Sequence, residues 1–431
     1  MSGRQVTRYA AYKESGVEWL GEVPEHWQVR RIKDMSTLQS GISIVSEQIE
    51  ENGEYPVYGG NGLRGYYSRY TNNGNYILIG RQGALCGNIN YASGKFWASE
   101  HAVVVYLNSR VNIKWYGEML KVMNLNQHSI AAAQPGLAVD RIKRLLLPVP
   151  PLPEQTAIAA YLDTKTAQID LQVELLNKKA MQYGKLKQSL INETVTRGLD
   201  GTVPMKESGV EWIGEVPAHW EVKRLKELGK IQNSNVDKKT HPDEKAVRLC
   251  NYVDVYKHEF INSRLLQEFM LATADESEIK KFAVKQNDVL ITKDSETADD
   301  IAIPALVTET LIGVLYGYHL AQIRTNSKKL FGPYLFRLFQ SNSYNSRFEV
   351  SAKGITRVGL GQSAISDALT PVPPLPEQTA IAAYLDTKTA QIDRIVSAIN
   401  TQIDKLKELR KTLINDVVTG KIKVIPEGEL A

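Results

Sequence analysis

The chain has 431 residues, of which 43% are hydrophobic, 23% charged and 8% aromatic, and its formal net charge is +4. This length predicts two or three domains, and the near-average apolar fraction excludes global disorder. Neither a membrane-spanning apolar run nor the apolar core of a signal peptide occurs, so we expect a soluble, cytoplasmic protein without a membrane partner. The two cysteines, Cys86 and Cys250, lie far apart, which excludes a disulfide scaffold and a cysteine-rich zinc site.

Two segments of the chain are repeated. Residues 13–35, KESGVEWLGEVPEHWQVRRIKDM, recur at 206–228 with 16 of 23 positions identical, and residues 148–170 recur unchanged at 371–393. The stretches between these repeats show no clear similarity to each other. We call the repeated segments the frames and the unlike stretches between them the inserts. Near-identical frames suit the same kind of partner bound twice, whereas different inserts suit two different ligands. The predicted parts are a leader with variable domain 1 (13–147), helix 1 (148–198), a leader with variable domain 2 (206–370) and helix 2 (371–420).

Histidine and tryptophan occur together in both leaders. His26 stands next to Trp27, and His219 stands next to Trp220, and we expect a structural role for both histidines. The leader tryptophans are expected to pack as anchors rather than to face a partner. They are Trp19, Trp27, Trp212 and Trp220.

Variable domain 1 contains a glycine-rich hexapeptide, residues 60–65, that fits the pattern GxGxxG. The following residues are turn-rich and aromatic without a helical period, which argues against a dinucleotide-binding loop. Two interpretations stay open: a loop that brings Gly60, Asn61 and Arg64 to a phosphate or base edge, or a plain hairpin. Arg81 and Gln82 follow a predicted strand at 76–79. Their side chains suit guanine and adenine edges, with a surface turn as the alternative.

Each PLPEQ motif begins a long predicted helix. Pro153 and Pro376 suit a helix start, and Glu154 and Glu377 favour its positive end. Apolar residues then recur at every seventh position, and this pattern predicts a coiled coil about 60 Å long. The column comprises Leu162, Ile169, Leu176, Tyr183 and Leu190 in the first helix and Leu385, Ile392, Ile399, Leu406 and Leu413 in the second.

Variable domain 2 has a predicted strand at 289–292 that is followed by Lys-Asp-Ser-Glu, and a second candidate segment at 353–357. A carboxylate in a DNA site can accept a hydrogen bond from cytosine N4 or position a neighbouring lysine. We predict DNA contacts at Lys293, Ser295, Thr356 and Arg357, with a plain surface turn as the alternative.

The linker between helix 1 and the second leader restricts how the two helices pair. Residues 199–205 span at most about 25 Å when extended, well short of the helix. A parallel pair would require the chain to double back along the whole coil, whereas an antiparallel pair does not. We therefore predict a mixed α/β protein in which two globular domains are joined by two long antiparallel coiled-coil helices with pseudo-two-fold symmetry.

The sequence offers little sign of catalysis. It has no P-loop, no HExxH and no recognisable nucleophile with a base, and no metal or cofactor site is expected. Asp-Thr-Lys at 163–165 and at 386–388 fits a nuclease fragment, but both copies fall within the predicted helices, so we interpret them as surface charges.

The leader WxGxxPxHW, the helix entrance PPLPEQxxIAxYLD and their repetition resemble the specificity (HsdS) subunit of type I restriction–modification enzymes, from residue 13 to about residue 423. Residues 55–67 and 76–105 look like one class of target-recognition domain, and residues 287–307 and 317–324 look like another. The resemblance implies a non-catalytic subunit in which each variable domain reads one half of an asymmetric bipartite site in double-stranded DNA.

The same resemblance implies the partners. The helices would set the gap between the half-sites and dock two methyltransferase (modification) subunits, and restriction (motor/nuclease) subunits would join them. S-adenosylmethionine, ATP and Mg are expected in those partners, with no cofactor in this chain. Two alternatives stay open: a two-headed coiled-coil scaffold that binds two proteins rather than DNA, and an enzyme whose motifs are not recognised.

Overall fold

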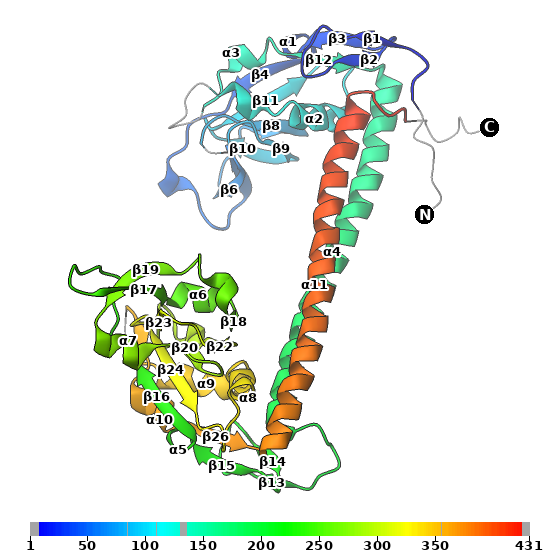
Figure 1. Ribbon diagram of the computed structural model, residues 1–431. Helices are drawn as coiled ribbons and strands as arrows, with labels where there is room; N and C mark the ends of the chain where they lie inside the picture. Colours follow the sequence, from blue (N-terminus) through cyan, green and yellow to red (C-terminus); the bar gives the residue numbers. More distant parts are fainter. Residues whose placement is uncertain (1–7, 84, 109, 130–135, 355, 425–431) are drawn as a thin grey trace. The chain divides into compact units, whose positions relative to one another are not determined.

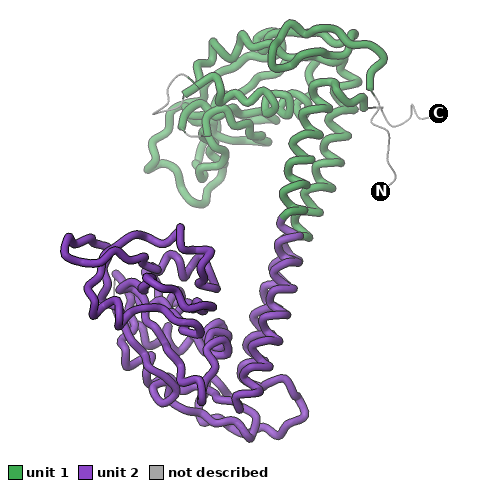
Figure 2. Tube along the Cα trace, viewed as in Figure 1, with its two compact units in different colours: residues 1–176, 401–431 green, residues 177–400 purple. Residues whose placement is uncertain are grey.

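The computed structural model describes residues 8–83, 85–108, 110–129, 136–354 and 356–424. The chain forms two compact units, residues 1–176 with 401–431 (unit 1) and residues 177–400 (unit 2), coloured separately in Figure 2. Each unit contains one leader, one variable domain and a part of both long helices. No helix among these residues is both long and apolar enough to cross a membrane.

The two leaders have the same secondary structure, as their near-identical sequences require (Figure 1). Each forms a short hairpin, a third strand and one helical turn. The third strand pairs antiparallel with the strand directly before the long helix, so that leader and helix entrance are joined. In unit 1 these elements are β1 (Tyr12–Glu14), β2 (Glu22–Pro24), β3 (Gln28–Arg31), α1 (Ile32–Met35) and β12 (Leu146–Val149). In unit 2 they are β13 (Met205–Glu207), β14 (Glu215–Pro217), β15 (Glu221–Arg224), α5 (Leu225–Leu228) and β26 (Leu369–Val372).

The central sheets of the two variable domains share one strand order, although their sequences show no clear similarity. In each sheet the first strand pairs antiparallel with the last, which pairs antiparallel with a central strand, and a fourth strand follows. In unit 1 the order is β4 (Ser36–Ser40), β11 (Ala102–Leu107), β8 (Tyr76–Gly80) and β9 (Ile89–Ala92). In unit 2 it is β16 (Gly229–Asn233), β24 (Leu320–Thr325), β20 (Val289–Thr292) and β22 (Pro304–Val307), extended by β18 (Phe260–Ile261).

The remaining elements differ between the variable domains. Unit 1 adds a second sheet of β5 (Tyr55–Gly59), β6 (Gly62–Tyr67), β7 (Asn72–Asn73) and β10 (Lys95–Ala98), with helices α2 (Ile113–Val122) and α3 (Val139–Ile142). Unit 2 adds strands β17 (Lys245–Cys250), β19 (Met270–Ala274), β21 (Asp294–Ser295), β23 (Val314–Tyr316) and β25 (Val358–Gly359). Its helices are α6 (Tyr252–Lys257), α7 (Glu276–Phe282), α8 (Gly332–Phe339), α9 (Asn342–Ser351) and α10 (Gln362–Ser366).

The long helices α4 (Leu152–Arg197) and α11 (Leu375–Val418) run antiparallel (Figure 1). Within unit 1, Arg410 Nε lies 2.9 Å from Asp170 Oδ1, and within unit 2, Lys187 Nζ lies 2.9 Å from Asp393 Oδ1. The residue numbers of the two pairs have the same sum, as one antiparallel register requires. The predicted mixed α/β class and antiparallel pairing are confirmed.

The predicted heptad column is buried in the N-terminal part of each helix and only partly buried in the C-terminal part. Leu162, Ile169, Leu385, Ile392 and Ile399 are buried, whereas Leu176, Tyr183, Leu190, Leu406 and Leu413 are partly buried. Lys187 and Arg410, which stand three residues before Leu190 and Leu413, form the ion pairs described above. The expected domain boundaries stay a prediction, since the compact units divide within the helices.

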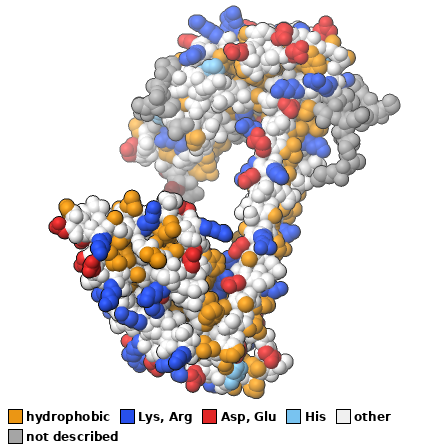
Figure 3. Space-filling view, viewed as in Figure 1, with side chains coloured by type: hydrophobic (Ala, Val, Ile, Leu, Met, Phe, Trp, Pro, Cys, Tyr) orange, Lys and Arg blue, Asp and Glu red, His pale blue; other side chains and the backbone are white. Residues whose placement is uncertain are grey.

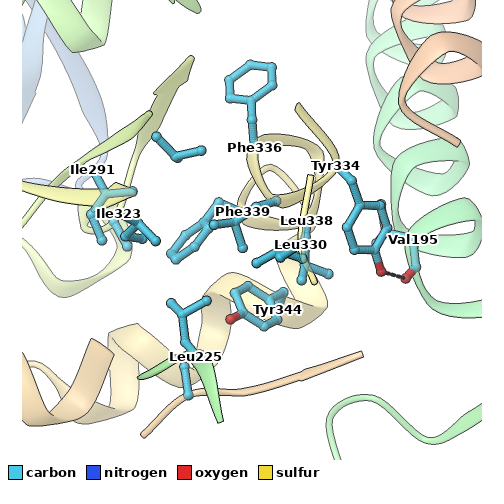
Figure 4. Close-up of a cluster of buried hydrophobic side chains, with 14 of the residues drawn as sticks. Val195, Leu225, Ile291, Ile323, Leu330, Tyr334, Phe336, Leu338, Phe339 and Tyr344 are labelled. Atoms are coloured by element: carbon cyan, nitrogen blue, oxygen red, sulfur yellow. Dashed lines mark hydrogen bonds between the residues drawn. The ribbon is translucent and has the colours of Figure 1, made fainter. Parts of the chain in front are cut away.

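The core of unit 2 shows how a variable domain is attached to the helices (Figure 4). Tyr334 of α8 is fully buried and donates hydrogen bonds to Val195 O of α4 at 3.2 Å and to Pro371 O of β26 at 3.1 Å. Phe339 and Tyr344 pack edge to face beside it, with ring centroids 5.1 Å apart. Because one apolar cluster includes domain and helix residues, the variable domain is packed directly onto the coil.

Candidate nucleic-acid interface

Unit 1 has an open cleft of about 500 Å³ that collects four of the five contact residues predicted in variable domain 1. Gly60, Asn61, Arg64 and Gln82 line it together, whereas Arg81 does not. The Arg81 side chain is half-buried, and its Nη1 donates to Ser40 Oγ of β4 at 3.2 Å. The remaining lining residues are Gly62, Leu63, Gly83, His101 and Gly136.

Glycines let two backbone segments meet at the base of this cleft. A Cβ atom on Gly80 would lie 2.1 Å from Gly60 O, and one on Gly60 would lie 2.9 Å from Gln82 O. Any larger residue at either position would therefore push the β5–β6 turn away from the end of β8. The hexapeptide forms the turn of a hairpin and the beginning of its second strand, β6, and the next element is a strand rather than a helix, so the structure excludes the dinucleotide loop.

Unit 2 has a smaller cavity of about 140 Å³ at the corresponding end of its sheet. Of the predicted residues, Ser295 and Arg357 line it, because β21 and β25 pair and bring the two segments together. Lys293 binds Asp294 Oδ2 at 2.8 Å, and Thr356 is exposed nearby without lining the cavity. The other lining residues are Tyr252, Tyr256, Asp294, Glu296, Asp300 and His319.

The two sites occupy equivalent positions in the shared sheet. Both follow the central strand, β8 or β20, and the predicted strands at 76–79 and 289–292 are confirmed. The first residue after the strand donates its backbone N–H to a histidine that precedes the last strand: Arg81 to His101 O at 2.8 Å, and Lys293 to His319 O at 3.0 Å. The same scaffold thus presents different side chains at one place in each domain.

Neither of these histidines was predicted from the sequence. His101 Nε2 lies 3.1 Å from Glu100 Oε1, and His319 Nδ1 lies 3.0 Å from Asp294 Oδ2. Their only sequence signal is the position just before an apolar strand, and only the strand pairing shows that this position faces the site. Tyr256 was missed too. Burial and its bond to Asp300 raise the pKa of the Tyr256 hydroxyl, which donates to Asp300 Oδ2 at 2.9 Å.

The glutamate of each PLPEQ motif binds the leader. Trp27 Nε1 donates to Glu154 Oε2 and Trp220 Nε1 donates to Glu377 Oε1, both at 3.1 Å. His26 and His219 lie 2.9 Å from the same carboxylates. Tyr9 OH also donates to Glu154. Burial is the main cause that raises the pKa of the Tyr9 hydroxyl above its usual value, and this hydrogen bond is the second. The expected structural role of the leader histidines agrees with these contacts.

The glutamine of each motif binds the variable domain. Gln155 Oε1 accepts from the backbone N–H of Asn112 at 2.9 Å, and Gln378 Oε1 accepts from that of Phe331 at 2.7 Å. Asn112 and Phe331 are the N-cap residues of α2 and α8, the helices that follow the last strand of each sheet. Each glutamine also donates to the carbonyl five residues earlier, Pro150 or Pro373.

The expectation for the leader tryptophans holds for Trp27 and Trp220, which are fully buried, and Trp212 packs against Tyr344 with ring centroids 5.1 Å apart. It is wrong for Trp19, which is 42% exposed. The second leader has the same turn, and there Tyr344 of α9 packs on the equivalent tryptophan, Trp212. The residues of the insert, rather than the turn, therefore decide whether this tryptophan is covered.

The aspartates of the Asp-Thr-Lys segments act as structural contacts. Asp163 lies 3.5 Å from Lys114 of α2, and Asp386 lies 2.7 Å from Arg337 of α8. Both are helical, as expected. Among the described residues, no group of three or more histidine, cysteine, aspartate or glutamate side chains is arranged to hold a metal ion.

Comparison with known proteins identifies the family. Residues 24–178 and 217–405 match the family described as "Type I restriction modification DNA specificity domain". The chain belongs to this family. The two matched segments cover both variable domains and the N-terminal parts of both long helices.

Several similar proteins are named as specificity subunits of type I restriction enzymes. This chain is 50% identical over 119 residues to the type I restriction enzyme EcoprrI specificity subunit of Escherichia coli. The alignment covers 28% of this chain and 30% of that protein. It is 25% identical to the MjaVIII specificity subunit of Methanocaldococcus jannaschii over 96% of this chain and 97% of that protein.

Solved structures share the fold. A chain from a study titled "Structural basis underlying complex assembly and conformational transition of the type I R-M system" aligns with a TM-score of 0.69 and 15% identity over 92% of this chain and 98% of that chain. The HsdS subunit from Thermoanaerobacter tengcongensis aligns with a TM-score of 0.52 and 15% identity over 93% of this chain and 98% of that chain.

Proposed function

We propose that this chain is the DNA specificity subunit of a type I restriction–modification complex, in which each variable domain reads one half of an asymmetric bipartite site. One observation carries the proposal: two sheets of the same topology, mounted on near-identical frames, present different side chains at equivalent positions. The shared frame suits one geometry of docking on DNA, and the unlike side chains suit two different half-sites.

The chain's surroundings in the complex are part of this proposal. The helices α4 and α11 set the gap between the half-sites and dock two methyltransferase subunits, with restriction subunits joining the assembly. S-adenosylmethionine, ATP and Mg belong to those partners, and this chain is non-catalytic. Half-sites read from one side of the duplex lie about one helical turn, ~10 base pairs, apart.

The proposal is tested by mapping methylated motifs across the genome in strains with and without the chain. We expect one asymmetric bipartite motif that is methylated only when the chain is present. Replacement of residues 36–147 by an unrelated variable domain should change one half-site and leave the other intact. An unchanged motif would favour the scaffold that binds two proteins instead of DNA.

The non-catalytic assignment has its own test. The purified chain should transfer no methyl group from labelled S-adenosylmethionine to DNA that contains the motif, and addition of the modification subunits should produce transfer. Methyl transfer by the chain alone would contradict the assignment and favour an enzyme with unrecognised motifs.

A further inference from the structure

We infer that Arg64 reads a guanine in the half-site recognised by unit 1, and that Gly59 and a β-bulge hold its guanidinium in position for that contact. The inference rests on the proposed function and names the base chemistry of one of its two sites. It follows from the backbone at Arg64, the space beside it and the charge of the cleft.

The backbone of the β5–β6 hairpin is irregular at Arg64. Val57 pairs with Gly65, but the next residue, Tyr58, pairs with Leu63, so that Arg64 is left without a partner on β5. This extra residue is a β-bulge, a device that re-aims a side chain out of the regular alternation of a strand. Gly65 directly follows with φ +148°, a conformation that other residues rarely adopt.

The bulge lays the stem of Arg64 across Gly59. A Cβ atom on Gly59 would lie 2.4 Å from Arg64 Cδ and 3.0 Å from its Cγ, so the arginine stem occupies the place of a missing side chain. A long side chain that already packs against the backbone loses less conformational freedom when it binds a ligand. Gly59 is therefore a positioning residue for Arg64.

The charge of Arg64 is not compensated within the described part of the chain. The side chain is exposed, it has no ion-pair partner there, and no aspartate or glutamate lines the cleft. The nearest acidic group along the chain to the lining residue His101 is Glu100, which binds that histidine. An arginine held in this way is available for a ligand that presents hydrogen-bond acceptors.

Guanine fits this arrangement best among the four bases. In the major groove it presents two adjacent acceptors, O6 and N7, which match the fork of a guanidinium. Adenine and cytosine present an amino donor there, which would meet the arginine unfavourably, and thymine presents a single acceptor beside a methyl group. A lysine would keep the charge but lose the paired geometry.

The experiment uses the chain assembled with its modification subunits and short duplexes that contain the mapped motif. Each base pair of the first half-site is replaced in turn, and binding is measured at several salt concentrations. For the unmodified chain, replacement of one guanine should weaken binding about 5- to 150-fold, the usual value of one paired arginine contact. With Arg64→Ala this preference should disappear at that position alone, and Arg64→Lys and Gly59→Ala should reduce it.

Recognition of the second half-site is the internal control, because it shows that the variant complex is folded and assembled. Arg144→Ala removes an exposed arginine of unit 1 that does not line the cleft, and it should leave both half-sites unchanged. A first half-site without guanine, or unaltered base preference in Arg64→Ala, would overturn the inference. Equal weakening on every sequence with a smaller salt dependence would also overturn it, since this indicates a phosphate contact. A wild-type complex that recognises no bipartite site would instead refute the proposed function.

Discussion

Glu154 concentrates several leader contacts in one carboxylate. The indole N–H of Trp27, the ring of His26 and the hydroxyl of Tyr9 all bind it, and Trp27 is fully buried. A buried N–H gives up its hydrogen bonds to water on folding. If its acceptor in the protein is then removed, the N–H stays unpaired, so loss of this carboxylate lowers stability by more than the net contribution of one hydrogen bond.

We expect Glu154→Ala to lower the free energy of unfolding by about 1–3 kcal/mol, because it leaves the Trp27 N–H buried without an acceptor. Glu377→Ala should have a similar effect through Trp220 in unit 2. Urea unfolding followed by tryptophan fluorescence measures both. Glu18→Ala, at an exposed leader position, is the matched control, and equal stability of all three variants would contradict the expectation.

Individual site residues were only partly predictable. Arg64 could be picked out because it stands in a glycine-rich hexapeptide, and Gln82 because it follows a predicted strand and is flanked by glycine and arginine. His101 and His319 could not, because their place in the site depends on strand pairing between distant segments. Trp19 shows the opposite failure: its residue type favours burial, but only Trp212, the equivalent residue of the second leader, packs on an aromatic side chain of its insert, Tyr344.

The aspartate of the repeated Asp-Thr-Lys segment binds a different helix of the variable domain in each unit. Asp386 of α11 binds Arg337 of α8, whose side chain is only 2% exposed, whereas Asp163 of α4 meets Lys114 of α2, where the two side chains are 60% and 51% exposed. The identical aspartates therefore contribute unequally, because a buried cation that loses its partner is far more costly than an exposed one.

Asp386→Ala should accordingly destabilise the chain by up to about 3 kcal/mol, since it removes the acceptor of both Nε and Nη2 of the buried Arg337 and leaves only Gln340 and, at 3.9 Å, Glu259 beside its Nη1. Asp163→Ala should cost at most about 1 kcal/mol. The two variants remove the same side chain from the same motif, so each serves as the control for the other in chemical denaturation. Equal losses would show that the burial of Arg337 does not matter.

The antiparallel helix pair makes a further prediction about the gap. Seven residues are removed from α4 between Asp170 and Lys187 and from α11 between Asp393 and Arg410, so that both ion pairs keep their register. The loss of about 10 Å of helix should shorten the recognised gap by about three base pairs while both half-sites stay the same. Methylation mapping gives the motif directly. Altered half-sites would mean that the helices do not set the gap.

At the level of elements the sequence was most informative where it is repeated. The heptad column and the PLPEQ entrance predict α4 and α11, and the apolar run before Arg81 predicts β8. The common sheet of the variable domains was not predictable, because many different apolar sequences satisfy the same strand order. The pairing of β4 with β11 and of β16 with β24 joins segments far apart in the sequence.

The whole molecule carries little excess positive charge. Variable domain 1, residues 36–147, has 10 lysine and arginine residues against 7 acidic ones, and variable domain 2, residues 229–370, has 18 against 17. On the face shown in Figure 3, cationic and anionic side chains are interspersed on both units. Binding to the phosphate backbone depends on neutralised phosphates and released counterions, and a balanced surface supplies few of these.

We therefore expect the isolated chain to bind DNA weakly at physiological salt and the complex with its modification subunits to bind tightly and site-specifically. Fluorescence anisotropy with a motif-containing duplex and a scrambled duplex measures both states across a salt series. Tight, sequence-specific binding by the chain alone would contradict the expectation.

The contact between Gln155 and Asn112, repeated by Gln378 and Phe331, has a consequence for how new specificities arise. In both contacts the glutamine side chain accepts a hydrogen bond from a backbone N–H, a group that nineteen of the twenty amino acids possess. A different variable domain acquired by recombination can thus form this contact whatever its side chain at positions 112 and 331. Proline is the exception, because it has no backbone N–H to donate.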